Sequence, residues 1–125
     1  MSELPETVTK AWSNRKGPAV LTTVDKNGIP NTVYVTCISI FNNDTILIAD
    51  NFFNKTRQNI LAGSKGSFLF ITDDEKAFQI KGNIEYHKKG KIFEDMKKWN
   101  PPQHPGHAAV VLRVEEVYTG AKKLL

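Results

Sequence analysis

The chain has 125 residues, of which 40% are hydrophobic and 24% charged, a composition that suits one globular domain over residues 1–125. No run of 18 apolar residues and no signal-peptide pattern occurs, which favours a cytoplasmic protein over a membrane or secreted one. The net charge of +4 is spread over short lysine pairs, without the basic, aromatic-lined stripe that is typical of nucleic-acid-binding proteins.

The hydrophobic pattern predicts three short helices and six strands. Leu4, Val8 and Trp12 share one face of the first helix, so this helix should plug one end of the fold. The predicted helices run from Pro5 to just before Asn14, from 55 to 62, and between Gly90 and Asn100. The predicted strands cover residues 19–24, 32–40, 45–49, 67–72, 77–86 and 108–118.

Features of the strands predict a curved, closed sheet. The second strand is apolar on both faces, so residues 32–40 should be covered on two sides. Asn27-Gly28 predicts a tight turn before it, and the first three strands should follow one another as a meander. Gly82, in the middle of an alternating strand, indicates a bulge or a close backbone approach. The sequence therefore predicts a mainly β, six-stranded antiparallel barrel with short peripheral helices.

The stretch 50–63 has a charge order that is unusual for a helix that binds nothing. Asn54 is a good N-cap, and the helix after it carries Lys55 and Arg57 in its first turn. A cation at this positive end of the helix dipole costs about 0.3–1 kcal/mol, and a bound anion would reverse that cost. Lys55, the Thr56 hydroxyl and the free amides therefore form a candidate phosphate site. The alternative is a surface helix whose two cations extend into solvent.

The remaining reactive side chains identify no catalytic residue and no metal site. Cys37, the single cysteine, lies in an apolar strand, where a packed thiol is expected rather than a nucleophile. His104 and His107 lie three residues apart in a proline-rich loop, but a metal site would need a third ligand. His104 is a candidate proton donor near a bound ring, with simple exposure as the alternative. The helical spacing of Trp99 favours the core over a ligand platform.

Four segments occur in the order typical of one known family. They are Ala19-Val-Leu-Thr-Thr-Val-Asp-Lys-Asn-Gly-Ile-Pro30, Ile46-Leu-Ile-Ala-Asp50, Lys55-Thr-Arg-Gln-Asn59-Ile-Leu and Gln79-Ile-Lys-Gly82. In these segments, which anchor residues 15–86, the chain resembles the FMN-binding split-barrel superfamily, specifically the short proteins similar to pyridoxamine 5'-phosphate oxidase. The resemblance implies an antiparallel split barrel that forms a homodimer and holds FMN between its subunits.

The resemblance also implies a role for particular residues. It places the FMN phosphate near Lys55 and Thr56, in agreement with the charge order of the helix, and the flavin ring along 33–36. Backbone amides directed at the ring would stabilise the charge of reduced flavin. Asn59 is expected to tie the helix to the preceding loop, and the partner chain would supply Gln79 or Trp99. The implied cofactor-binding residues are Val33, Tyr34, Val35, Thr36, Ala49, Asp50, Asn51, Lys55, Thr56, Gln79 and Trp99.

The sequence leaves the activity open. No second cluster of Arg and Lys is available to bind a phosphorylated substrate, which argues against pyridoxamine 5'-phosphate oxidase activity itself. We therefore expect a redox protein, either a reductase of flavin or small acceptors or an electron carrier. The alternatives are a relative that uses F420 or haem, and a cofactor-free module such as a nucleic-acid-binding small barrel. Val33, Tyr34, Val35 and Ile38, with the helix of Trp99, are the candidate surface covered in the dimer.

Overall fold

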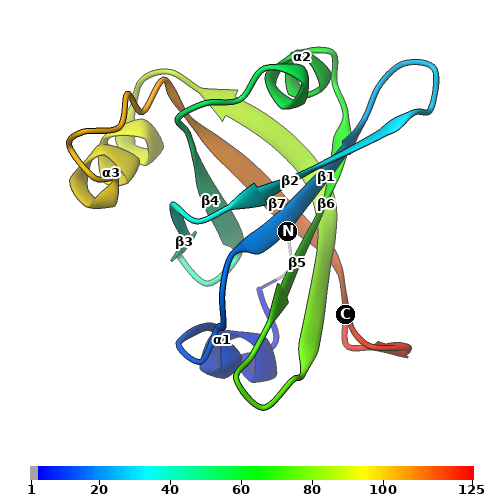
Figure 1. Cartoon of the computed structure of the whole chain (residues 1–125). Coiled ribbons are helices and arrows are strands. Elements are labelled where there is room, and N and C mark those ends of the chain that lie inside the picture. The colour runs from blue at the N-terminus through cyan, green and yellow to red at the C-terminus, as the bar shows by residue number, and fades with distance from the viewer. Residues whose placement is uncertain (1–2) are drawn as a thin grey trace.

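The computed structural model describes residues 3–125 and shows one strongly curved sheet of eight antiparallel strands, with three short helices around it (Figure 1). The strands are β1 (Ala19–Val24), β2 (Pro30–Val35), β3 (Ile38–Phe41), β4 (Thr45–Asp50), β5 (Lys65–Ile71), β6 (Ala77–His87), β7 (Ala108–Thr119) and β8 (Lys122–Lys123). The helices are α1 (Glu6–Trp12), α2 (Lys55–Leu61) and α3 (Lys91–Trp99). The predicted mainly β, antiparallel split barrel is confirmed, with eight strands in place of six. None of the helices within residues 3–125 is long and apolar enough to cross a membrane.

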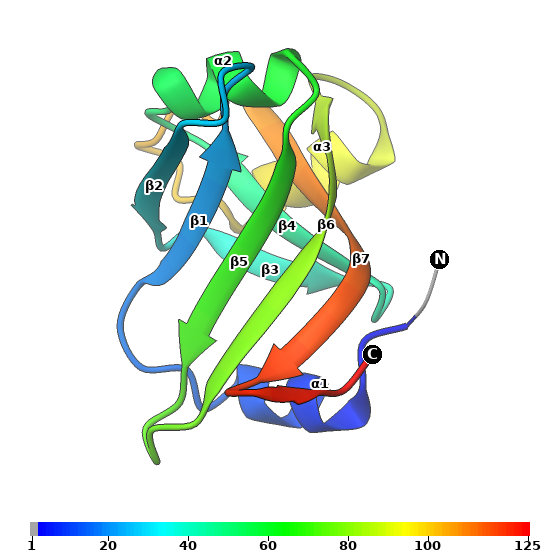
Figure 2. The same cartoon turned by 90° about the vertical axis from the view of Figure 1, so that its right-hand side faces the viewer.

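The order of the strands explains why the sheet curls. Seven strands are hydrogen-bonded in the order β2-β1-β5-β6-β7-β4-β3, and β8 pairs with β7. The sheet therefore ends in β2 on one side and β3 on the other, although only two residues of the chain separate these strands. This short connection forces the two edges of the sheet to approach each other. The result is a barrel that stays open between β2 and the β3–β4 hairpin (Figure 2).

The predicted second strand, residues 32–40, is in fact two strands. β2 ends at Val35, which is in register with Ala19 of β1, and β3 begins at Ile38, which is in register with Ile48 of β4. One straight strand cannot pair with both neighbours, so the chain turns at residues 36–37. The two apolar faces of this stretch thus belong to two strands in different surroundings, and the prediction of one strand covered on both sides is wrong.

The break also changes which residues a second subunit could cover. Val35 is buried in the core, and Val33 and Ile38 are partly buried against it. Three of the four strand residues predicted for the dimer surface therefore pack inside their own chain. Tyr34 alone of the four points outward, and it is 77% exposed. A homodimer stays a prediction, but it needs a different surface.

The main core lies inside the curled sheet, and α1 closes one end of it. Val8 is fully buried, and the Trp12 ring stacks on Phe68 with a centroid distance of 5.8 Å. The predicted plug is therefore confirmed. A smaller apolar cluster forms where α3 packs Met96 against Ala49 of β4.

Gly82 forms a bulge in β6. The register of β6 with β7 shifts between Lys81 and Gly82, as the sequence predicted. A Cβ atom at Gly82 would collide with the backbone carbonyl of Arg113 on β7. Because a bulge increases the local twist of a strand, Gly82 marks the point where these two long strands bend around the core.

Replacing Gly82 by alanine should destabilise the fold by about 1–3 kcal/mol, because the backbone of β7 must move to admit the methyl group. Gly66→Ala is the matched control, since the methyl group there meets side-chain atoms of Ile84, which can adjust more easily than the backbone of a neighbouring strand. Urea unfolding of both variants measures the difference. A Gly82→Ala variant as stable as the wild type would contradict the close approach.

Candidate functional site

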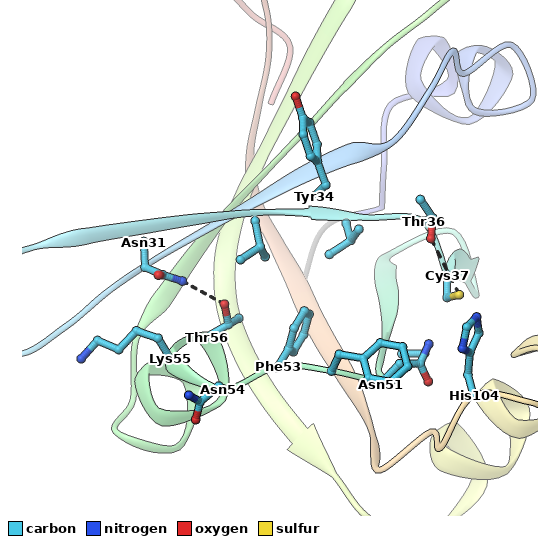
Figure 3. Close-up of a pocket in the computed structure, with 14 residues that line it drawn as sticks. Asn31, Tyr34, Thr36, Cys37, Asn51, Phe53, Asn54, Lys55, Thr56 and His104 are labelled. Carbon is cyan, nitrogen blue, oxygen red and sulfur yellow. Dashed lines mark hydrogen bonds between the residues drawn. The ribbon is translucent and has the colours of Figure 1, made fainter.

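A cavity of about 530 Å³ opens at the split of the barrel, between β2 and the segment that joins β4 to α2 (Figure 3). Its volume is within the usual range of small-molecule sites. Segment 51–56 forms one wall, β2 forms the other, and His104 lies at one end. The lining residues are Asn31, Val33, Tyr34, Val35, Thr36, Cys37, Ala49, Asn51, Phe52, Phe53, Asn54, Lys55, Thr56 and His104.

β2 offers the cavity its backbone as well as its side chains. As an edge strand it pairs with β1 on one side only, so N–H and C=O groups on its other edge have no partner in the sheet. Tyr34 points away from the cavity in Figure 3, and the alternation of side chains puts Val33 and Val35 on the opposite face. The cavity therefore combines an apolar wall with hydrogen-bonding groups along an open strand edge, which suits a flat ring with polar atoms at its rim.

Lys55, Thr56 and Asn31 form the polar end of the cavity. Thr56 is only 3% exposed, and Asn31 Nδ2 donates a hydrogen bond to Thr56 Oγ1 at 2.9 Å. Thr56 Oγ1 accepts this bond and donates none among the hydrogen bonds of the described residues, so its proton is available to an acceptor in the cavity. The side chain of Lys55 is half exposed and adds a positive charge. A cationic and a hydroxyl donor side by side have the chemistry that suits an anion.

Asn54 occupies the N-cap position of α2, but its side chain does not cap the helix. It makes no hydrogen bond to a first-turn amide, and its Oδ1 lies 3.5 Å from Gln58 Nε2 instead. The predicted side-chain cap is therefore wrong. Because α2 has only seven residues, the side chains of Lys55 and Thr56 define the polar end of the cavity more than the helix terminus does.

Arg57 does not join this polar end, and it does not extend into solvent as the alternative prediction had it. Its guanidinium donates to Asp50 from Nε at 2.7 Å and from Nη2 at 3.1 Å. The Tyr86 hydroxyl donates to the same carboxylate, and the Phe53 amide donates to it at 3.0 Å. Asp50 is fully buried and is absent from the cavity lining, so its carboxylate has a structural role, and its contact with a cofactor stays a prediction.

The charges of this cluster support one another. Burial opposes ionisation of Asp50, but the hydrogen bonds from Arg57, Tyr86 and Phe53 outweigh it and hold the pKa of Asp50 below its usual value. The hydrogen bond to Asp50 raises the pKa of Arg57. Burial, together with the bond to Asp50, raises the pKa of Tyr86 to about 12. At neutral pH the cluster is therefore an ion pair with a neutral tyrosine, and it fixes α2 to the ends of β4 and β6.

A buried pair of asparagines fixes segment 51–56 to the loop after α3. Asn51 Nδ2 donates to Asn100 Oδ1 at 3.0 Å, and Asn100 Nδ2 donates to Asn51 Oδ1 at 2.9 Å. The same oxygen of Asn51 accepts from the Gly106 amide at 3.0 Å. These bonds hold loop 101–107 against the cavity, where the His104 ring meets Phe52 edge-on at a centroid distance of 5.5 Å.

Asn59 ties α2 to the sheet. Its Nδ2 donates to Thr23 Oγ1 at 3.0 Å, and both residues are buried. Asn59 does not line the cavity, so its role is structural, with β1 as the partner instead of the expected loop.

Gln79 and Trp99 lie outside the cavity of their own chain. Gln79 is on the outer face of β6 and donates to Ser67 Oγ at 2.8 Å. Trp99 packs on the small cluster under α3 and donates from Nε1 to Asp95 at 3.1 Å. It borders a second hollow of about 330 Å³ that adjoins the first. Their supply by a partner subunit stays a prediction.

The structure brings eight of the eleven predicted cofactor-binding residues together around the cavity. They are Val33, Tyr34, Val35, Thr36, Ala49, Asn51, Lys55 and Thr56. Asn31, Phe52, Phe53 and Asn54 were not predicted as lining residues, and Cys37 was predicted only to pack. Phe52 and Phe53 carried a signal, since two adjacent aromatic residues lie just after a strand end, with Asn51 between them and the strand. Asn31 carried none, because its place beside Thr56 depends on how the β1–β2 hairpin meets α2.

Comparison with known proteins identifies the family. The family model for pyridoxamine 5'-phosphate oxidase matches residues 6–120. The chain belongs to the pyridoxamine 5'-phosphate oxidase family. An uncharacterized protein of Methanocaldococcus jannaschii is 33% identical over 121 residues, which cover 93% of this chain and 80% of that protein. The resemblance seen in the sequence is thus confirmed.

Three solved structures share the fold. HupZ of Group A Streptococcus has a TM-score of 0.81 at 22% identity and matches over 96% of each chain. An FMN-binding protein of Syntrophomonas wolfei has a TM-score of 0.74 at 22% identity, covering 93% of this chain and 96% of that one. An F420 reductase has a TM-score of 0.70 at 16% identity, covering 92% of this chain and 98% of that one. At these identities the similarity establishes the split-barrel fold alone.

Replacing Arg57 by methionine should destabilise the protein by about 3 kcal/mol near pH 7, because the buried Asp50 carboxylate loses its counter-charge. Gln58→Met, on the same helix, is the control and should change stability by less than about 0.5 kcal/mol.

The effect of Arg57→Met should also depend on pH. The pKa of Asp50 is lowered in the folded protein, so the ion pair contributes stability above the unfolded-state pKa of about 4 and loses it as pH falls toward the folded value. The difference between variant and wild type, measured by urea unfolding, should therefore shrink below about pH 4. An equal difference at neutral and acid pH would contradict the ionic cluster.

Proposed function

We propose that the protein binds FMN at the split of the barrel and works as a homodimeric redox protein. One observation carries this proposal: a cavity whose polar end holds Lys55 and Thr56 continues into an apolar wall with an open strand edge at β2. FMN has a phosphate, a flexible ribityl chain and a flat ring with polar atoms, so its parts match the cavity in order. The FMN-binding protein of Syntrophomonas wolfei, which shares the fold, supports the choice of cofactor.

Lys55 and Thr56 would hold the phosphate. An ammonium group and a hydroxyl donate charge-assisted hydrogen bonds to phosphate oxygens, and these are the strongest hydrogen bonds available to side chains. Asn31 donates a hydrogen bond to the Thr56 oxygen, and the hydroxyl proton of Thr56 would point to the ligand. Arg57 is bound to Asp50, so a single full positive charge serves the site.

The isoalloxazine ring would lie along β2 beside residues 33–36. Bound there, FMN supplies reversible uptake of one or two electrons. Backbone N–H groups of the open strand edge, directed at N1, O2 and N5, would stabilise the charge that the ring gains on reduction and so set its potential. His104 lies at one end of the cavity, where an imidazole can donate a proton to the ring or to a substrate.

The outer face of the sheet supports a homodimer. One row of residues crosses five strands on this face, because each member is in register with the next. The row consists of Tyr34, Val20, Leu69, Gln79 and Tyr118. Tyr34 is 77% exposed and Leu69 is 40% exposed. Such a row, apolar or aromatic except for Gln79, favours burial against a second copy of the chain and would bring Gln79 into the interface.

The residues described around the cavity include no second cationic site for the phosphate of a substrate. Among the described residues that line it, Lys55 is the only lysine or arginine. Oxidation of pyridoxamine 5'-phosphate would need another cationic group for the phosphate of the substrate. We therefore favour a reductase of flavin or of small acceptors, or an electron carrier, over the oxidase.

F420, haem and nucleic acid are the competing ligands. One structural neighbour is an F420 reductase, but both F420 and haem are larger than FMN, and a cavity of about 530 Å³ with one anion-binding end favours the smaller ligand. Parallel titrations with FMN, F420, haem and an oligonucleotide separate these possibilities. Tighter binding of any competitor than of FMN would replace the proposal.

The purified protein should bind about one FMN per chain, and Lys55→Ala should weaken this binding by about 1.5–3 kcal/mol, because it removes a charge-assisted hydrogen bond. Thr56→Ala should cost less, since the donor that it removes is uncharged. Riboflavin, which lacks the phosphate, is the matched control ligand and should respond little to either change. Quenching of flavin fluorescence measures all four affinities. Failure to bind FMN, or equal losses for FMN and riboflavin, would contradict the phosphate site.

The protein should have twice the mass of the chain by light scattering, and Leu69→Glu should weaken dimerisation by about 100-fold or more, because it buries an unpaired charge at the centre of the row. Leu61→Glu, on α2 and 62% exposed, is the control and should leave the dimer intact. A wild-type monomer that binds FMN tightly would rule out a shared site.

A further inference from the structure

Asp25 places a negative charge next to the polar end of the cavity. It lies in the turn between β1 and β2, and its side chain is 16% exposed. Oδ1 accepts hydrogen bonds from the amides of Asn27 and Ile29, both at 2.9 Å. Oδ2 lies 3.8 Å from Lys55 Nζ. One oxygen therefore builds the turn, and the other faces the cation that the ligand needs.

The turn itself does not require this charge. An asparagine would offer the same Oδ1 acceptor to both amides, and asparagine is as well suited to turns as aspartate. The hydrogen bond from Ile29, then that from Asn27 and the nearby Lys55 and Lys26, hold the pKa of Asp25 below its usual value. The carboxylate is therefore ionised at neutral pH, and its charge acts on the groups around it.

Lys55 thus has two competing anions. The distance of 3.8 Å to Asp25 exceeds a hydrogen bond, so the pair is loose, and the half-exposed ammonium can be drawn to another acceptor. A phosphate bound by Lys55 comes close to the Asp25 carboxylate, and two like charges at this range repel each other. Both effects weaken the binding of a phosphate and leave an uncharged ligand unaffected.

We propose that Asp25 is a specificity-determining residue that competes with the phosphate of the ligand for Lys55 and so limits the affinity for phosphorylated flavin. This inference rests on the proposed function and deepens it. A site with a built-in competitor releases FMN more readily, which suits a protein that exchanges its flavin.

The test is a double-mutant cycle on flavin binding. Asp25→Asn keeps the Oδ1 acceptor of the turn and removes the charge, so it should tighten FMN binding by about two- to five-fold and leave riboflavin unchanged. The gain should vanish when Lys55→Ala is also present. Asp73→Asn removes the same charge from the β5–β6 turn, at the end of the barrel opposite α2 (Figure 2), and should change neither affinity. Asp25→Ser is a second neutral variant in case asparagine disturbs the turn.

Unchanged or weaker FMN binding by a folded Asp25→Asn variant would overturn the inference, as would an equal gain for riboflavin. A wild-type protein that binds neither flavin would overturn the proposed function instead. The inference is then tested with pyrophosphate, which should shift the amide NMR signals of Lys55 and Thr56 at lower concentration in Asp25→Asn than in the wild type. Equal midpoints of the pyrophosphate titration for the two proteins would overturn the inference.

Discussion

The buried carboxylate of Asp50 holds together the parts that form the cavity. At the end of β4 this carboxylate accepts hydrogen bonds from Arg57 of α2, Tyr86 of β6 and the amide of Phe53. The backbone carbonyl of Asp50 accepts another from the His107 amide at 2.9 Å. A buried ion costs several kcal/mol unless its partners replace the lost water, and these donors do so. These bonds fix the positions of α2 and segment 51–56 beside the cavity, and they pair the charge of Arg57 with Asp50. Lys55 is left as the cation at the cavity.

The open edge of β2 is the second constraint, and it follows from topology. The short connection of residues 36–37 draws the two ends of the sheet together but leaves them unpaired, so β2 keeps free backbone groups. An exposed strand edge invites aggregation unless something covers it. In the proposed assembly β2 is covered twice, because the cofactor lies along its inner side and a second subunit covers the outer face beside Tyr34. Cofactor binding and dimerisation would then each support the other.

Local signals predicted most of the fold. Residues 19–24 match β1 because alternation and the Asn27-Gly28 turn lie within one short stretch, and Gly82 marked its bulge because few other reasons exist for glycine in such a strand. The predictions that failed concern contacts between residues that are distant in sequence. The break after Val35 depends on which neighbour each half pairs with, and the environment of the Asp50–Arg57 pair depends on Tyr86, which is distant in sequence. β8 was missed because two exposed lysines carry no hydrophobic pattern.

The candidate site divides in the same way. Lys55 and Thr56 were predictable because the charge order of one helix and a family pattern both identify them, whereas Asn31 lies beside Thr56 only through the fold. A crystal structure of the protein with FMN tests the central claim most directly. We expect phosphate oxygens within about 3.2 Å of Lys55 Nζ and Thr56 Oγ1, with the ring along residues 33–36, at the end of β2. A phosphate at the His104 end of the cavity, or a flavin bound outside it, would contradict the account.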